Sequence, residues 1–290
     1  MTTLTIRKLN IDLSGGFARH WHGGDAFRSQ YYIALSMSFP VGEQYFMDSV
    51  RAGAALLPQD AVHQPLHDLV RGFIGQEATH RHVHGLYNAQ LEKQGLSNIW
   101  ARLATWRIEQ SRRLHVLHHL AITAAYEHCT AVFAEGTLRY PSWFDAAEPK
   151  MRTLWRWHAV EETEHRAVAF DVYQALGGGT LRRSLWFAYV LVLFSLDAGV
   201  QTTLNLWRDK SLFKPSTWWS ATTFFFGRDG VAWRCTLPLL AYFKPGFHPG
   251  GPPSDATSAT GDSGDALAGQ WLAAHSDQWR AVGKTSVETP

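Results

Sequence analysis

Two stretches of the sequence decide the fold: Glu77-Ala78-Thr79-His80 and His158-Ala159-Val160-Glu161-Glu162-Thr163-Glu164-His165. Each contains a Glu three residues before a His, and on an α-helix this spacing places both side chains on one face. Two further glutamates, Glu43 and Glu127, alternate with these Glu-x-x-His pairs along the chain. A four-helix bundle that holds two metal ions in its core needs this order of ligands. The sequence therefore predicts an all-α protein with a dinuclear metal site.

His158 adds a third residue to the second ligand face. It lies four residues before Glu162 and seven before His165, so the three side chains share one side of the predicted helix. We therefore include His158 among the expected metal ligands.

Two neighbouring residues leave alternatives open. His84 lies four residues after His80 and is a further ligand, a residue that orients a ligand, or a histidine there by coincidence. Glu161 lies four residues before His165 and competes with Glu162 for a bridging position. The offset of three residues, which both Glu-x-x-His pairs share, favours Glu162.

The alternative interpretation places these residues on solvated helix faces, where Glu and His are ordinary. Their neighbours argue against it, because Glu77 follows Phe73-Ile74-Gly75 and Glu127 follows Ile122-Thr123-Ala124-Ala125-Tyr126. Buried carboxylates need a cation to offset their loss of hydration. Oxygen and imidazole ligands without cysteine suit iron, manganese or zinc, and argue against a structural zinc site. Four carboxylates nearly neutralise two divalent ions, which favours iron or manganese.

Apolar periodicity predicts helices, and no segment alternates long enough to indicate a sheet. Residues 1–29 are Gly-rich and predict an irregular lead-in. The helical pattern of residues 26–57 is broken at Phe39-Pro40-Val41-Gly42, so we expect a helix from Glu43 to Ala55 with Glu43 in its first turns. Further helices are expected at residues 62–94, at residues 98–138 as a short helix and a long one, and at residues 148–176.

A second, more apolar part of the chain follows Gly177-Gly178-Gly179. Residues 30–250 form one helical domain in this interpretation, with an apolar helical extension over residues 180–247. The run from Leu185 to Leu196 is shorter than the roughly 20 residues that span a bilayer. It is either a buried helix or, together with the aromatic residues up to 226, a substrate channel or a peripheral membrane contact. Residues 248–290 predict a flexible linker and a short helix at residues 266–282.

Composition limits the classes of binding partner. The chain has 27 Lys and Arg against 25 Asp and Glu, and its formal charge of +2 gives no electrostatic field suited to binding nucleic acid. The 15 His residues agree with metal binding. Cys129 and Cys235 stand apart in apolar contexts and indicate buried thiols in a reducing compartment. The N-terminus lacks the apolar run of a secretory signal, so we expect the cytoplasm, with membrane association left open.

The ligand stretches resemble those of the ferritin-like di-iron carboxylate superfamily. Over about residues 30–250 the chain is more closely similar to a bacterial family labelled predicted metal-dependent hydrolase. The position of His158 also resembles the ligand pattern of para-aminobenzoate N-oxygenase, although amine oxidation does not carry over from that pattern alone. These resemblances imply seven metal ligands, with Glu77 and Glu162 as bridges: Glu43, Glu77, His80, Glu127, His158, Glu162 and His165.

Three functions fit this ligand set. The first is oxidation of a small apolar or aromatic substrate by O2 at an iron pair, with an external electron donor. The second is hydrolysis of an ester or amide, in which two metals lower the pKa of a water. The third is iron storage, which the large apolar extension disfavours. The substrate, the electron donor and a homodimer are left open by the sequence.

Overall fold

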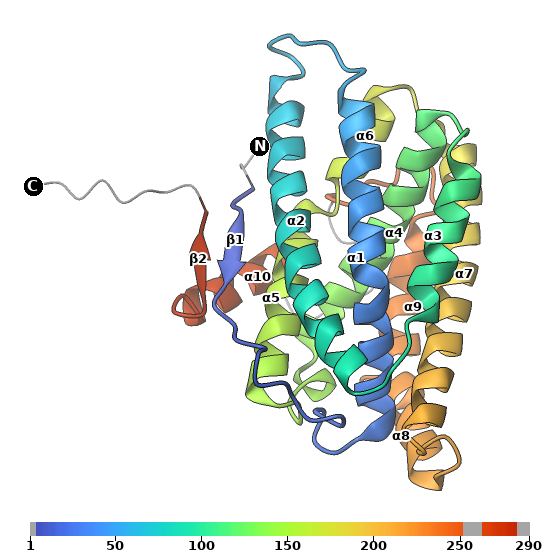
Figure 1. The fold of residues 1–290 in the computed structure, drawn as a ribbon. Helices are drawn as coiled ribbons and strands as arrows, with labels where there is room; N and C mark the ends of the chain where they lie inside the picture. The colour runs from blue at the N-terminus through green and yellow to red at the C-terminus, as the bar shows by residue number, and fades with distance from the viewer. Residues whose placement is uncertain (1–3, 252–262, 283–290) are drawn as a thin grey trace, which may run out of the picture.

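The structure, a computed structural model, describes residues 4–251 and 263–282 of the 290-residue chain. It is almost wholly helical, and the all-α prediction is confirmed (Figure 1). The helices are α1 (Ala26–Ala54), α2 (Gln64–Lys93), α3 (Ile99–Ser111), α4 (Val116–Arg139), α5 (Pro149–His165), α6 (Val168–Ala175), α7 (Thr180–Arg208), α8 (Pro215–Phe226), α9 (Val231–Ala241) and α10 (Gly264–Ala274).

Four helices, α1, α2, α4 and α5, surround the centre of the molecule. Helix α1 packs against α2 and α4, and α4 packs against α5. Helix α7 lies along α1 and α4, while α8 packs on α1 and α9 packs on α4. Apolar clusters lie on both sides of the centre, one around Tyr32 and Trp155 and the other around Val50 and Phe170. Glu43 stands between Tyr32 and Val50 on α1.

Helix α1 runs unbroken through Pro40, so the predicted break at residues 39–42 is wrong. Proline has no amide hydrogen, and the carbonyl of Ser36, four residues earlier, therefore loses its helical partner. Asn88 of α2 replaces that partner, because its Nδ2 donates to the Ser36 carbonyl oxygen at 2.9 Å. Asn98 likewise donates to the carbonyl of Met37 at 2.7 Å. These tertiary hydrogen bonds keep α1 continuous and place Glu43 well inside it.

The helix predicted at residues 148–176 is two helices, α5 and α6, which separate directly after His165. Arg166 lies at this junction. Its guanidinium donates to the carboxylate of Asp265 on α10 and, at 2.9 Å, to the carbonyl of Pro249. The end of α5 is thereby attached to two later parts of the chain.

The termini of the described chain meet in a small sheet that the periodicity did not predict. Strand β1 (Arg7–Leu9) lies in the predicted lead-in and pairs antiparallel with β2 (Trp279–Ala281). The helix predicted at residues 266–282 therefore ends early, since α10 stops at Ala274. Three residues are too few for alternation to reveal a strand. Most of the predicted linker, residues 252–262, lies outside the described residues.

Helix α7 is much longer than the apolar run from Leu185 to Leu196. In the described part of the chain it is the one helix long and apolar enough to cross a membrane, judged by length and composition. Only 33% of its most apolar window is buried. The interpretation as a simple buried core helix is therefore wrong.

Candidate metal centre

The predicted ligands come from four helices and meet at the core. Glu43 lies on α1, Glu77 and His80 on α2, and Glu127 on α4. His158, Glu162 and His165 lie on α5. None of the seven residues is more than 4% exposed. The alternative of solvated helix faces is therefore excluded.

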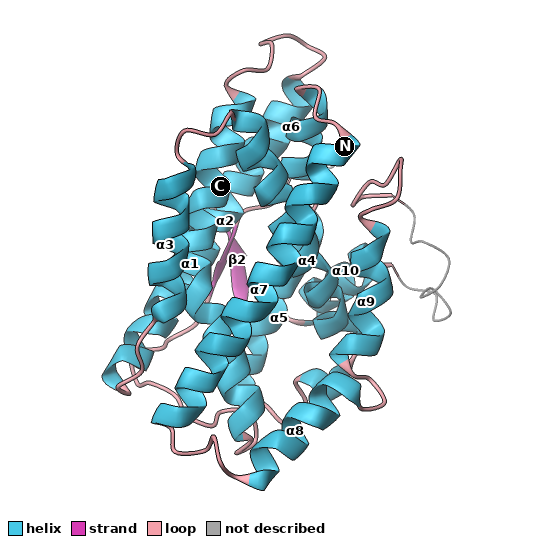
Figure 2. Ribbon diagram, turned by 90° about the vertical axis from the view of Figure 1, so that its right-hand side faces the viewer, coloured by secondary structure: helices cyan, strands magenta, loops and turns pink. Residues whose placement is uncertain are grey.

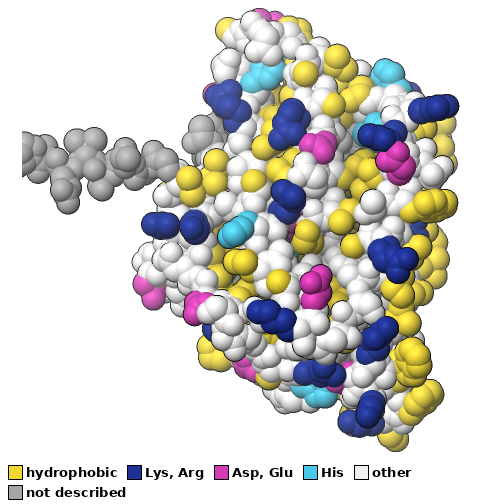
Figure 3. Space-filling model, in the orientation of Figure 1, with side chains coloured by type: hydrophobic (Ala, Val, Ile, Leu, Met, Phe, Trp, Pro, Cys, Tyr) yellow, Lys and Arg dark blue, Asp and Glu magenta, His cyan; other side chains and the backbone are white. Residues whose placement is uncertain are grey.

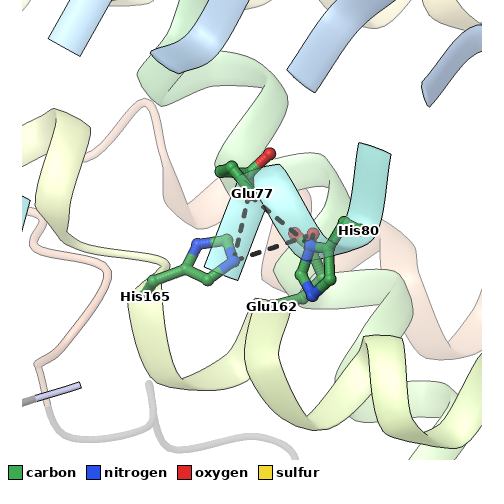
Figure 4. A group of neighbouring side chains, drawn as sticks. All are labelled: Glu77, His80, Glu162 and His165. Carbon is green, nitrogen blue, oxygen red and sulfur yellow. Dashed lines mark ion pairs between the residues drawn. The ribbon is translucent and has the colours of Figure 1, made fainter. Parts of the chain in front are cut away.

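Four of these side chains form a first group, shown in Figure 4: Glu77, His80, Glu162 and His165. One ligand atom from each lies within 4.8 Å of the others. His165 Nε2 lies 3.1 Å from Glu77 Oε1, and His80 Nδ1 lies 3.4 Å from Glu162 Oε1. The two Glu-x-x-His pairs therefore face each other across the α2 and α5 packing.

A second group shares one histidine with the first. It consists of Glu43, His80 and His158, whose ligand atoms also lie within 4.8 Å of one another. His158 Nε2 lies 2.9 Å from Glu162 Oε1, which links the second group to the first. Two adjoining groups of this kind can hold two ions.

The hydrogen bonding of these atoms tests whether metal ions fit. Both carboxylate oxygens of Glu43 and of Glu77 are buried without a hydrogen bond, and so are His80 Nδ1 and His165 Nε2. Buried polar atoms are normally satisfied, and each unsatisfied one costs about 1 to 3 kcal/mol. Here the unsatisfied atoms point at one another. Their chemistry, carboxylate oxygen and imidazole nitrogen, is the donor set that iron, manganese or zinc takes.

Glu127 joins the cluster through His165. Its Oε2 lies 2.9 Å from His165 Nδ1, so the imidazole ring lies between Glu127 and Glu77. Glu127 belongs to neither of the two groups in this arrangement. It contacts the cluster from the α4 side.

Glu161 lies behind His80 rather than between the two groups. Its Oε2 is 3.0 Å from His80 Nε2, while its Oε1 is 3.3 Å from a guanidinium nitrogen of Arg7. Arg7 also forms two hydrogen bonds to Glu164, at 2.7 and 2.8 Å. A carboxylate on the outer nitrogen fixes the tautomer and ring orientation of a ligating histidine. Arg7 lies in the predicted lead-in, and no motif or periodicity pointed to it.

His84 lies behind His158 in the same way. Its Nε2 is 2.8 Å from His158 Nδ1, and its Nδ1 is 2.8 Å from the hydroxyl of Ser36. That hydroxyl donates to Asn88 Oδ1 at 3.0 Å. His84 contacts no carboxylate of the cluster among these bonds, so the geometry favours its orienting role over ligation.

Burial dominates the electrostatics of the free carboxylates. It raises the pKa of Glu43 and of Glu127 well above the usual range, and that of Glu77 to about 7. Burial also acts to raise the pKa of Glu162, but the nearby His165 and His158 outweigh it and hold that pKa well below the ordinary value. Without metal, the cluster must take up protons to avoid unpaired buried charge.

A narrow apolar space adjoins the cluster. A cavity of about 40 Å³ is lined by His158 and Glu162 and otherwise mainly by carbon. A second cavity, of about 140 Å³, lies between α1, α3, α4 and α7. Phe39, Thr130 and Phe194 line both cavities. The two cavities therefore adjoin each other between α7 and the ligand cluster.

A family described as "predicted metal-dependent hydrolase" matches residues 5–251 of the chain. The chain belongs to this family. No curated protein and no solved structure matches it. A metal-dependent activity agrees with the clustered carboxylates and histidines, which all lie inside the matched range.

Proposed function

We propose that the protein is a dinuclear metal enzyme whose ligands are the seven predicted residues. The observation that carries this proposal is the convergence of unsatisfied buried atoms from Glu43, Glu77, His80 and His165. Iron is the expected metal. The same donor atoms also suit manganese or a mixed pair of iron and manganese. Glu127 would complete the set by turning from His165 toward the ions.

We further propose that the enzyme oxidises a small apolar or aromatic substrate with O2. An iron pair would supply the reduction of O2, with electrons from an external donor. The aromatic and aliphatic lining of the two cavities admits an apolar molecule and excludes bulk water. Within the chain, Glu161 orients His80 and His84 orients His158. The ligand spacing resembles that of the ferritin-like di-iron superfamily and of para-aminobenzoate N-oxygenase, and both resemblances support oxidation.

Hydrolysis of an ester or amide is the second candidate. The family description supports it directly. In that case two metal ions would lower the pKa of a water, and Glu162 or His158, which line the small cavity, would face the scissile bond. Zinc or manganese would serve this chemistry without a redox change.

Metal content and redox behaviour separate these functions. The protein is purified without added metal, and bound metal is measured by mass spectrometry together with EPR or Mössbauer spectra before and after dithionite and O2. Two irons per chain that cycle between oxidation states support the oxidase. Two redox-silent ions favour hydrolysis and direct the substrate search to esters and amides. Many irons per chain would indicate storage.

Ligand variants test the site itself. His80→Ala and Glu162→Ala should each lower bound metal below two per chain, whereas the exposed neighbour His82 should tolerate His82→Ala without loss. His84→Ala should keep metal content near normal. Unchanged metal content in either ligand variant would remove that residue from the proposed set.

A further inference from the structure

The outer side of α7 is an exposed apolar stripe. Its members recur at helical spacing along the whole helix: Leu181, Leu185, Tyr189, Val192, Leu196 and Val200. Each is at least 49% exposed. An exposed apolar stripe of this length marks an interaction surface.

Exposed aromatic residues extend this stripe over α8 and α9. Trp218 and Trp219 lie on α8, Trp233 lies on α9, and Phe213, in the α7–α8 loop, is 88% exposed. Figure 2 shows α7, α8 and α9 together on the side turned to the viewer. Figure 3 shows hydrophobic side chains gathered along the edge that α7 occupies in Figure 1. We call this surface the α7–α9 face.

The inner side of α7 carries buried polar residues that attach it to the protein body. Asp197 is ion-paired with Arg107 of α3, with one contact at 3.0 Å. Gln201 accepts hydrogen bonds from the amides of Ile99 and Trp100, both at 2.9 Å. A helix tied down by these contacts cannot be surrounded by lipid. Helix α7 therefore presents one apolar side outward instead of spanning a bilayer.

Charge distinguishes this part of the chain. Residues 180–250 hold eight Lys and Arg against three Asp and Glu, whereas the whole chain holds 27 against 25. The three acidic residues, Asp197, Asp209 and Asp229, are all in ion pairs. The α7–α9 face therefore lies in the basic part of a chain whose remainder is acidic.

Cations also stand directly beside the exposed aromatic residues. Arg208 follows the exposed Trp207, and Lys214 follows Phe213. Lys244 follows Phe243, an exposed residue just after the end of α9. Exposed cations of this kind reach the headgroup level while the adjacent rings enter the interface.

We propose that the α7–α9 face docks the protein on the surface of an anionic lipid bilayer. Trp, Phe and aliphatic side chains would enter the interface, and the flanking Lys and Arg would pair with acidic headgroups. A second copy is the less suitable occupant, because a symmetric contact would place two basic surfaces against each other. Tyr189 both belongs to the stripe and lines the 140 Å³ cavity, so docking would place that cavity next to the lipid.

Vesicle cosedimentation of the full chain tests this proposal without reference to enzymatic activity. Phosphatidylcholine vesicles with and without about one third phosphatidylserine are compared at low salt. We expect binding to the anionic vesicles and much weaker binding to the neutral ones. Each Lys near an anionic surface contributes about fivefold in affinity, so Lys214→Gln with Lys244→Gln should weaken binding about 30-fold. Trp218→Ser with Trp219→Ser should weaken it at least about tenfold.

Matched controls on α2 exclude general effects of surface substitution. Leu86 is exposed and apolar, and Arg81 is exposed and basic, but both lie far from α7 in sequence on another helix. Leu86→Ser and Arg81→Gln should leave vesicle binding unchanged. Failure of the unaltered protein to bind anionic vesicles would overturn the proposal, and so would unaltered binding by the Trp218→Ser, Trp219→Ser variant. A concentration-dependent dimer that this variant abolishes, without vesicle binding, would assign the face to a second copy.

Discussion

At the scale of single residues, His80 occupies the central position. It belongs to both ligand groups, and its outer nitrogen contacts Glu161, which Arg7 holds in turn. Burial alone would lower the pKa of His80, but its contacts with Glu161, Glu162 and Glu77 outweigh burial and raise it. Glu161 therefore determines which nitrogen of His80 faces the cluster.

Glu161→Gln should weaken metal binding without abolishing it. The amide retains the shape of the carboxylate but loses its charge, and loss of such an outer partner typically costs about 10- to 100-fold in metal affinity. Competition with a chelator of known affinity measures this change, and His82→Ala serves as the control. Complete loss of metal would make Glu161 a ligand instead, and full affinity would show that it has no orienting role.

Part of the cluster of carboxylates and histidines could be predicted from the sequence because its members on α2 and α5 follow a helical offset. Glu77 and His80, like Glu162 and His165, are three residues apart. Arg7 follows no such rule, since the strand that carries it pairs with β2 and lies against α2. Contacts between residues 154 positions apart depend on the tertiary structure and leave no local signal.

At the scale of secondary-structure elements, α1 shows how tertiary contacts override local propensity. The missing amide of Pro40 predicts a break, but Asn88 satisfies the free carbonyl of Ser36. Helix α2, which has Pro65 in its first turn and Gly95 just past its end, was predicted nearly to its ends. Only knowledge of which α2 side chain faces α1 could have corrected the prediction at Pro40.

Asn88→Ala should destabilise the protein by about 1 to 3 kcal/mol, because it leaves the Ser36 carbonyl unsatisfied. The same substitution should cost less in a Pro40→Ala background, where the new amide at position 40 can bond to that carbonyl. Urea unfolding of the four proteins in this double-mutant cycle measures the difference. Equal costs in both backgrounds would contradict the proposed role of Asn88.

The lead-in is attached to the bundle by another buried residue, His22. Its Nε2 donates to the carbonyl of Trp143 at 2.7 Å, and burial lowers its pKa below the ordinary value. A histidine with a lowered pKa binds a proton more readily in the unfolded chain. Its contribution to stability is therefore present above about pH 6.5 and is lost as the pH falls below it.

His22→Gln should reduce the pH dependence of unfolding between about pH 7.5 and 5.5. The glutamine can replace the hydrogen bond to Trp143 but does not titrate. Chemical denaturation at constant metal load measures the slope, and the exposed His82 provides the matched control His82→Gln. An unchanged slope in His22→Gln would show that His22 is not the titrating group.

At the scale of the whole molecule, the buried carboxylates and the basic surface lie in different parts of the chain. The carboxylate cluster is enclosed by α1, α2, α4 and α5, while the basic, apolar surface lies on α7, α8 and α9. The two adjoining cavities lie between these parts. The sequence indicated the carboxylates and histidines and the apolar extension, but it did not indicate the basic surface, and the approach of the two parts depends on the packing of α7 along α1 and α4.

Removal of metal should destabilise the whole bundle, because the ligands come from each of its four helices. A ligand that binds only the folded state at about 1,000 times its Kd contributes about 4 kcal/mol. For a domain of this size that corresponds to a fall in Tm of about 8 to 16 °C when a chelator removes the metal. Calorimetry of the loaded and stripped protein measures this shift.

Two variants serve as controls for this shift in Tm. Glu162→Ala, which should hold less than two metals, should show a smaller shift, whereas His82→Ala should show the full one. Equal Tm values for the loaded and stripped protein would contradict a metal centre that joins the four helices.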